Sequence, residues 1–438
     1  MKSMRSRIIK KNVALLAFFA AILCISQVAI ADAVLDWNAI AVDTAVANGQ
    51  NPFAQGRYAA IVQLAVFEAV NTITHEYRPY LGTIPGHPGA SPEAAAIKAA
   101  YHVLSFYFPN SASTLNNALA NSLASIPNGQ SKTDGIAIGD AAASAMITLR
   151  ANDGSSPAQF KTPGPAVPGE WQATRSCPIV NGIASGIAFQ WQNLTPFGIR
   201  NAQDFLLPPP PALNSEQYAK TYNEVLTVGD VNSTDRPQDR ADVATFFAAT
   251  SPTQAFNQAA RQVAQQQSRS LSENARVLAL VNMAINDSLV ASFLNKYHYN
   301  FWRPETAIHA GDTDGNRKTE VDSNFQPFIA TPCFPSYPSN HGAAANAAAV
   351  ILRRLYGEDG HTIMLSNPAV PTITLQYHSF REITDDISDA RVYGGIHFRT
   401  DQDAGTQLGR SVGHFVYKYN LRRSTDDNDD EERCTRHR

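Results

Sequence analysis

Apolar residues recur every three or four positions along the first half of the chain, which is the spacing of one buried face of an α-helix. Between residues 55 and 75, for example, Ile61, Leu64, Phe67 and Val70 follow this spacing. The pattern predicts five helices, at residues 36–49, 55–75, 91–107, 111–125 and 133–150. We expect these segments to pack together as one helical half.

Helical spacing returns after residue 212. It predicts six more helices, at residues 215–228, 237–248, 255–267, 272–295, 342–356 and 400–419. Pro237 suits a first helical position, where its missing N–H loses no acceptor. Strand signals are few, and residues 372–375 carry the best of them. The chain is therefore predicted to be all-α, built from helical bundles.

A stretch rich in proline and glycine, residues 154–212, separates the two helical patterns. This composition favours an ordered but irregular connector, anchored by Trp171, Trp191 and Phe197. We therefore predict an N-terminal helical half at residues 32–153, this connector, and a C-terminal helical half at residues 213–423. Residues 424–438, with six acids and three arginines, are predicted to form a disordered charged tail.

Residues 1–31 have the three parts of a secretory signal peptide. A basic segment comes first, followed by an apolar run at residues 13–28 and a cleavage-like Ala29-Ile30-Ala31. We expect cleavage and a periplasmic or secreted protein; an uncleaved anchor helix is the alternative. No other uninterrupted apolar run reaches the 18 or so residues of a span, so no stable membrane span is expected after cleavage.

Charge argues against one class of function, and cysteine content limits the number of disulfides. Removing residues 1–31 removes five positive charges and no acids, so the formal net charge falls from −3 to −8. Such a chain is not expected to bind nucleic acid. Three cysteines remain, Cys177, Cys333 and Cys434, which allow at most one intrachain disulfide. A Cys177–Cys333 disulfide is permitted in an exported protein, and a free thiol at Cys333 is the alternative.

Three separated segments, at residues 296–304, 337–342 and 391–401, carry residues that suit a tetrahedral oxyanion. Phosphate and vanadate share several negative charges among their oxygens. An Arg guanidinium matches pairs of such oxygens, and Lys adds a compact point charge. We therefore interpret Lys296, Arg303 and Arg391 as anion-binding residues.

The second segment precedes a strong helix former that begins at Gly342. Ser339 is therefore a predicted helix N-cap, and the backbone N–H groups after it, that of Asn340 first, are free to face an anion. His341 is the candidate acid/base imidazole.

In the third segment, His397 and Asp401 are four residues apart, so on a helix they would share a face. Asp401 would then hold the imidazole in one tautomer and raise its basicity. Asp403 competes for this role, and we favour Asp401 on spacing. Asp287 is a weaker candidate, as a partner of His341 or of the region around Lys296.

The patterns Lys-x6-Arg-Pro, Pro-Ser-x-His and Arg-x5-His-x3-Asp resemble the type 2 phosphatidic acid phosphatase and vanadium haloperoxidase superfamily. The flanking residues look most like its soluble bacterial haloperoxidase-like branch. The likeness is sharp at residues 286–417 and looser back to residue 36. Two departures are Asn340, where the family usually has Gly, and Ala390, where it usually has Ser. The resemblance implies two four-helix bundles, with the anion site in the second.

The resemblance implies a vanadate-dependent haloperoxidase, which oxidises halide with hydrogen peroxide to a hypohalous species that can attack a small organic substrate. His397 would be the vanadium ligand. The vanadate oxygens would be held by Lys296, Arg303, Ser339, Arg391 and the N–H of Asn340. His341 would move protons, and Lys296 would polarise bound peroxide. Phe334 resembles the chloroperoxidase type, and an aromatic side chain packed at the pocket rim is the alternative.

Two alternatives stay open. A secreted acid phosphatase would use the same residues on a phosphate ester: His397 would form a phosphohistidine and His341 would protonate the leaving oxygen. A non-catalytic oxyanion-binding envelope protein is the other alternative, and Asn340 is the one residue that supports it.

Overall fold

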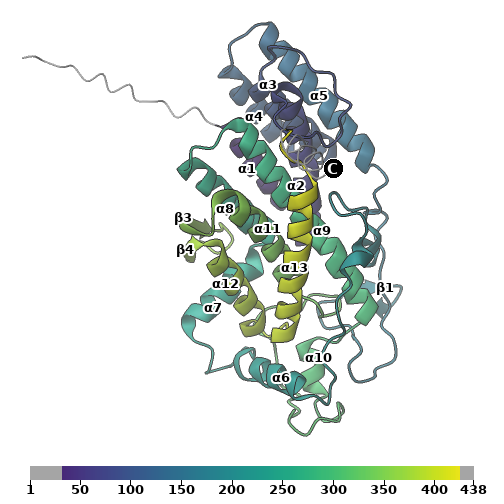
Figure 1. Ribbon diagram of the computed structural model, residues 1–438. Coiled ribbons are helices and arrows are strands. Elements are labelled where there is room, and N and C mark those ends of the chain that lie inside the picture. Colours follow the sequence, from purple (N-terminus) through teal and green to yellow (C-terminus); the bar gives the residue numbers. More distant parts are fainter. Residues whose placement is uncertain (1–31, 425–438) are drawn as a thin grey trace, which may run out of the picture. The chain divides into compact units, whose positions relative to one another are not determined.

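Helices account for most of the described chain, as the apolar spacing predicts (Figure 1). The computed structural model describes residues 32–424, so the predicted signal peptide and residues 425–438 of the predicted tail lie outside it. The N-terminal half contains α1 (Ala33–Ala47), α2 (Pro52–Thr74), α3 (Pro92–Tyr107), α4 (Ala112–Ala124) and α5 (Gln130–Arg150). All five predicted helices are present, and each end lies within three residues of its predicted position.

The C-terminal half is also helical, so the all-α prediction is confirmed. It contains α6 (Glu216–Val228), α7 (Gln238–Ala249), α8 (Pro252–Gln266), α9 (Leu271–Tyr299), α10 (Pro304–His309), α11 (Asn340–Tyr356), α12 (Phe380–Tyr393) and α13 (Arg399–Tyr419). The sequence pattern missed α10 and α12. In α12 the buried Phe380, Ile383 and Ile387 do keep helical spacing, but charged residues separate them. Pro237 is the N-cap of α7 and not its first helical residue.

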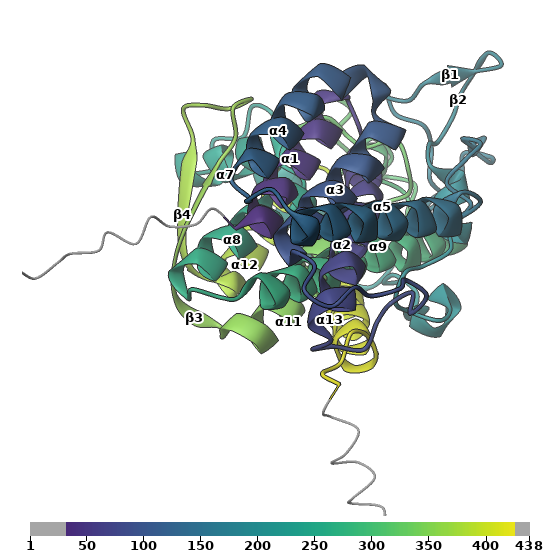
Figure 2. The same cartoon turned by 90° about the horizontal axis from the view of Figure 1, so that it is seen from above.

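Two short antiparallel hairpins lie on opposite sides of the helices (Figure 2). One, in the connector, pairs β1 (Ile179–Val180) with β2 (Ile183–Ala184). The other pairs β3 (Asp359–Ser366) with β4 (Thr374–Ser379), so the predicted strand at residues 372–375 overlaps β4 and the strand β3 was missed. In β3, buried His361, Ile363 and Leu365 alternate with exposed residues, the period expected of a strand with one covered face.

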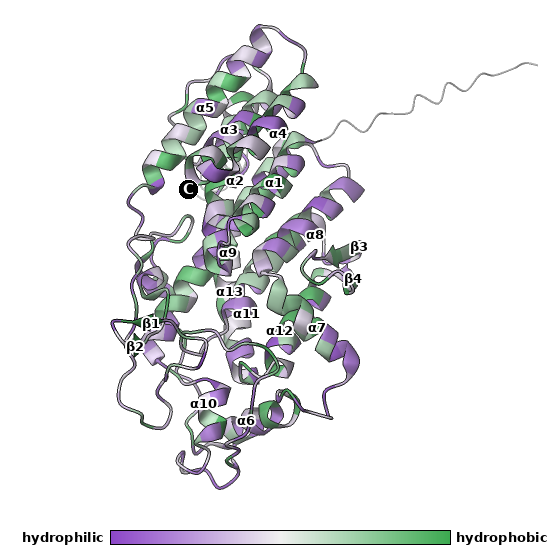
Figure 3. Ribbon diagram, turned by 180° about the vertical axis from the view of Figure 1, so that it is seen from behind, coloured by the Kyte–Doolittle hydropathy of each residue, from purple (hydrophilic) through white to green (hydrophobic). Residues whose placement is uncertain are grey.

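The long helix α9 lies at the centre and packs against α2, α11 and α13. Figure 3 shows hydrophobic residues along α2 and α9. By length and composition α9 is the one helix among residues 32–424 that could cross a membrane, yet its apolar window is entirely buried inside the protein. A chain of buried amides ties α9 to its neighbours: Asn257 of α8 donates to Asn282 of α9 over 2.8 Å, and Asn38 of α1 donates to Asn257 over 2.7 Å.

Close packing of α11 on α13 brings the starts of these two helices together. A Cβ at Gly409 would lie only 2.1 Å from the carbonyl oxygen of Ala343, so only glycine allows this approach. At the start of the pair, the backbone N–H of Ser339 donates to the carbonyl oxygen of Asp401 over 2.9 Å. The helix contact therefore fixes the second predicted segment against the third.

The connector is ordered, and Trp171, Trp191 and Phe197 are buried, as predicted. Buried Asp287 of α9 accepts hydrogen bonds from the backbone N–H groups of Phe197, Gly198 and Ile199, at 2.6–2.9 Å. The prediction that Asp287 partners His341 or the Lys296 region is therefore wrong: its carboxylate holds the connector on α9. The boundaries between the two halves and the connector stay a prediction.

Candidate oxyanion site

Helix ends bring the three predicted segments to one place. Lys296 lies in the last turn of α9, Arg391 in the last turn of α12, and Asp401 in the first turn of α13. Arg303 and Ser339 are the N-caps of α10 and α11, and Asn340 begins α11. His397 lies between α12 and α13. Each of these side chains is at least nine-tenths buried. Such charged residues are rarely buried together without a functional reason.

His397 and Asp401 form the predicted pair, with Nδ1 of His397 2.9 Å from Oδ2 of Asp401. The expected geometry was wrong, however. His397 precedes the N-cap Phe398, so the two residues do not share a helix face. Asp401 instead reaches back from the first turn and also accepts from the N–H of Phe398 over 3.1 Å. Asp403 takes no part in this pairing.

Ser336 is a member of this cluster that the sequence interpretation missed. Its hydroxyl donates to Oδ2 of Asp401 over 2.6 Å and lies 3.3 Å from Nδ1 of His397. It is fully buried. The only signal was its position in the Phe334-Pro335-Ser336 stretch just before the second segment.

Lys296 is bound by backbone carbonyl groups. Its ammonium donates to the carbonyl oxygens of Pro335 and Ser336 at 2.8 Å and of Pro338 at 2.6 Å. An ammonium has three protons, so these bonds use all of them. Direct contact of Lys296 with an anion would therefore replace one carbonyl. Its role as an anion contact stays a prediction.

The guanidinium groups of Arg303 and Arg391 have protein acceptors for only some of their N–H donors. Arg303 donates to the carbonyl oxygens of Phe334 and Ile396, at 2.8 and 2.9 Å, and its Nη1 lies 2.9 Å from Nε2 of His397. Arg391 donates through Nη1 to Phe247 over 3.2 Å. Nη2 of Arg303 and Nε of Arg391 are buried without an acceptor. A buried donor left unpaired costs about 1–3 kcal/mol, so these two groups call for an acceptor.

The buried positive charges set the protonation of the cluster. Burial, followed by the charge of Arg303, holds the pKa of Lys296 well below its ordinary value. Burial lowers the pKa of Arg303 to about 9 and that of Arg391 to about 10. Burial and the neighbouring cations keep the pKa of both His341 and His397 well below 6.5. Both imidazoles are therefore neutral near neutral pH.

Burial raises the pKa of Asp401 to about 6, so it is a carboxylate above that pH. The tautomer of His397 follows. Nδ1 carries the proton and donates to Asp401, which leaves the lone pair of Nε2 as the acceptor for Arg303. A neutral imidazole whose Nε2 is unprotonated and whose Nδ1–H is bound to a carboxylate can act as a metal ligand or as a nucleophile.

The residues fit a bound oxyanion such as vanadate. The cluster contains three buried cationic side chains and one carboxylate, and two guanidinium N–H groups lack acceptors, so an anion would satisfy both charge and hydrogen bonding. Among residues 32–424 no group of three or more His, Cys, Asp or Glu could hold a bare metal ion. Ser339 caps α11 as predicted, with its hydroxyl accepting from the N–H of Gly342 over 3.2 Å.

A cavity of about 450 Å³ opens onto this cluster. Its lining includes Asn340, His341, Arg391 and His397 at the charged end. The remaining wall is mostly apolar and comes from both halves of the chain: Phe53, Ile187, Pro252, Leu289, Ile329 and Phe334. This volume far exceeds that of a single oxyanion, so the site also has room for further reactants.

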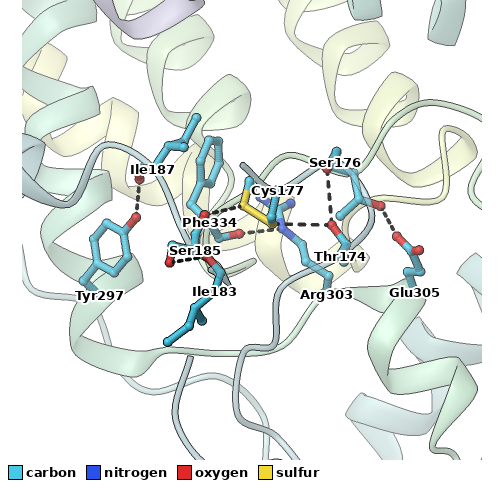
Figure 4. The surroundings of a disulfide bond; sticks show 12 residues. Thr174, Ser176, Cys177, Ile183, Ser185, Ile187, Tyr297, Arg303, Glu305 and Phe334 are labelled. Atoms are coloured by element: carbon cyan, nitrogen blue, oxygen red, sulfur yellow. Dashed lines mark hydrogen bonds between the residues drawn. A yellow bond between two sulfur atoms is a disulfide. The ribbon is translucent and has the colours of Figure 1, made fainter. Parts of the chain in front are cut away.

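A disulfide lies beside the cavity, and Figure 4 shows the residues around it. The Cys177–Cys333 alternative is the one that the structure contains, with the two Cα atoms 5.1 Å apart. Cys333 lines the cavity and precedes Phe334, and its carbonyl oxygen accepts from the N–H of Ile187 over 2.9 Å. The Phe334 ring lies 5.2 Å from the ammonium of Lys296 and 5.1 Å from the guanidinium carbon of Arg303. The connector therefore supports the loop that carries Phe334.

Comparisons with known proteins agree with this geometry. Residues 276–425 match the family model described as the VCPO second helical-bundle domain. A vanadium chloroperoxidase of Curvularia inaequalis is 30% identical over 92 residues, which cover 19% of this chain and 14% of that protein. The match therefore spans only a small part of the curated relative.

Solved structures extend the likeness to nearly the whole chain. A bacterial vanadium-dependent iodoperoxidase has a TM-score of 0.76 at 23% identity, covering 91% of this chain and 97% of that one. Apo and holo structures of a bacterial vanadium-dependent chloroperoxidase have TM-scores of 0.68 at 16% and 18% identity. They cover 84% of this chain and 92% and 91% of theirs. Residues 276–425 are therefore similar to the VCPO second helical-bundle domain family, and the chain shares its fold, over most of its length, with these bacterial vanadium-dependent haloperoxidases.

Proposed function

We propose that this protein is a vanadium-dependent haloperoxidase that oxidises halide with hydrogen peroxide to a hypohalous species. The observation that carries the proposal is the pair of buried guanidinium N–H groups without acceptors, on Arg303 and Arg391, beside the neutral imidazole of His397. An oxyanion would balance the guanidinium charges and accept their hydrogen bonds, and the imidazole would be a ligand for its central atom.

His397 would ligate vanadium through Nε2, since Nδ1 is committed to Asp401, and this ligation would replace the contact of Nε2 with Nη1 of Arg303. Arg303, Arg391, Ser339 and the N–H of Asn340 would hold the vanadate oxygens. Vanadate, when bound, supplies the Lewis acid that activates hydrogen peroxide toward halide. Ser336 and Asp401 keep the imidazole in the tautomer that presents Nε2.

His341 lines the cavity, and burial, followed by the charges of Arg391, Lys296 and Arg303, lowers its pKa. Its imidazole is therefore neutral and able to accept a proton from peroxide at neutral pH, then return it. Lys296 adds a buried positive charge whose field favours negative charge on reacting oxygens. The apolar wall around Phe334 limits water at the reacting atoms.

The substrates follow from this chemistry. Hydrogen peroxide and halide are small enough to enter together, and the rest of the cavity admits a small organic acceptor of the oxidised halogen. We further propose that the protein works in the periplasm or outside the cell, because residues 1–31 have the composition of a cleaved signal peptide.

The test is halide oxidation by protein stripped of bound anions, with and without added orthovanadate, for bromide, iodide and chloride. We expect turnover only with vanadate and peroxide together. His397→Ala should bind no vanadate and show no turnover, whereas His298→Ala, which alters another histidine outside the cluster, should behave like the parent. Absence of halide oxidation by folded, vanadate-treated parent protein would rule the proposal out.

A further inference from the structure

Asn340 places a side chain where the resembling family usually has none. It is the first residue of α11, between the N-cap Ser339 and His341. Asn340 is 7% exposed and lines the cavity together with His341, Arg391 and His397. It is not among the residues with positive φ, so the position does not require the conformational freedom of glycine.

The amide is held by a contact from α9. Ser292 is fully buried, and its hydroxyl donates to Oδ1 of Asn340 over 2.7 Å. Ser288, one turn earlier in α9, instead donates to the carbonyl oxygen of Ile285 within its own helix. The Ser292 contact therefore ties the amide oxygen to α9 specifically, while no acceptor among residues 32–424 receives a hydrogen bond from Nδ2.

This orientation has an electrostatic consequence. With Oδ1 committed to Ser292, the NH₂ group keeps its donors for another partner, and it belongs to a residue that lines the cavity. The N–H groups of Arg303 and Arg391 that lack acceptors are the other donors of the same site. An amide NH₂ adds hydrogen bonding to an anion without adding a further positive charge to three mutually repelling cations.

We propose that Asn340, held by Ser292, is an additional hydrogen-bond donor to the bound oxyanion. This inference rests on the proposed function only in that the oxyanion is taken to be vanadate; inorganic phosphate, which has the same tetrahedral shape, probes the same contact. Asn340 then increases oxyanion affinity.

The test is calorimetric titration of the stripped full-length protein with inorganic phosphate and, separately, with orthovanadate. Asn340→Ala should weaken the affinity for both anions by about tenfold or more, the size of one hydrogen bond to a charged group. Asn340→Asp should weaken both by a larger factor, since a carboxylate also repels the anion. Ser292→Ala should weaken binding in the same direction by a smaller factor, and the matched control Ser288→Ala should leave it unchanged.

The outcomes separate this inference from the proposed function. Parent-like phosphate affinity in Asn340→Ala and Ser292→Ala, both folded by their thermal midpoints, would overturn the donor role even if halide oxidation were intact. If Asn340→Ala does not fold, equal phosphate affinity in Ser292→Ala and Ser288→Ala overturns it instead. A parent that binds phosphate, loses affinity in these variants, yet never oxidises halide would refute the haloperoxidase and leave the donor role standing.

Discussion

Lys296→Met removes the ammonium that joins the end of α9 to the loop before α11. Three carbonyl oxygens, of Pro335, Ser336 and Pro338, lose their donor in a fully buried environment. Each orphaned acceptor costs about 1–3 kcal/mol. Removing the Lys296 charge also removes its repulsion with Arg303, which offsets part of this cost. We therefore expect the free energy of unfolding to fall by about 2–5 kcal/mol, as when other buried charge contacts are broken.

The assay is calorimetric thermal unfolding of parent and variant. Residues 32–424 lie in one compact unit, and roughly 390 residues at about 2.1 cal/mol/K each give an unfolding entropy near 0.8 kcal/mol/K. The midpoint should therefore fall by about 2–6 °C. Lys318→Met, which removes an exposed ion pair with Glu216, is the control and should shift it by less than about 1 °C. A Lys296→Met midpoint equal to that of the parent would refute the reasoning that this lysine secures the loop.

Three further predictions follow from the site and its support. In protein stripped of bound anions, histidine NMR spectra should show the His341 imidazole still neutral at pH 6.5. Phosphate should raise the pKa of His341, because the anion opposes the cations that help to lower it. A His341 pKa that phosphate does not change would contradict the placement of His341 beside the anion. Replacing Cys177 and Cys333 by Ser should lower stability by about 2–5 kcal/mol in denaturant unfolding, since the bond closes a separation of 156 residues; unchanged stability contradicts a structural role. Asp287→Ala should lower the thermal midpoint while leaving the phosphate affinity of the folded protein intact, and a loss of affinity would restore Asp287 to the site.

Local sequence was enough to predict most of the fold. The long helices α2, α9 and α13 have apolar spacing that needs no tertiary information, and their predicted ends are close to the observed ones. The short charged helix α12 and the strand β3 were missed. Each contains only a few apolar residues, and these elements form because tertiary contacts bury those residues. Three-residue errors at helix ends came from N-caps such as Asn51, which the apolar pattern alone does not locate.

The charged residues of the site could be selected from sequence, but their contacts could not. Spacing suggested the pairing of His397 with Asp401, yet the pair forms across a turn and a helix start instead of along a helix. The partners of Lys296 are backbone carbonyls 39–42 residues away, which carry no side-chain signal. Ser336 likewise joins Asp401 only because α13 packs beside α11. Long-range backbone geometry decides these contacts.

Competition between phosphate and vanadate tests the central claim, that the buried cations, Ser339 and His397 form one oxyanion site whose working anion is vanadate. Halide oxidation is measured in vanadate-loaded protein as phosphate is added, and again after excess vanadate, in parallel with hydrolysis of a simple phosphate ester. The account predicts that phosphate abolishes halide oxidation and that vanadate restores it, because both anions need the same cations. Rapid phosphate-ester hydrolysis that vanadate inhibits, without halide oxidation, would contradict it.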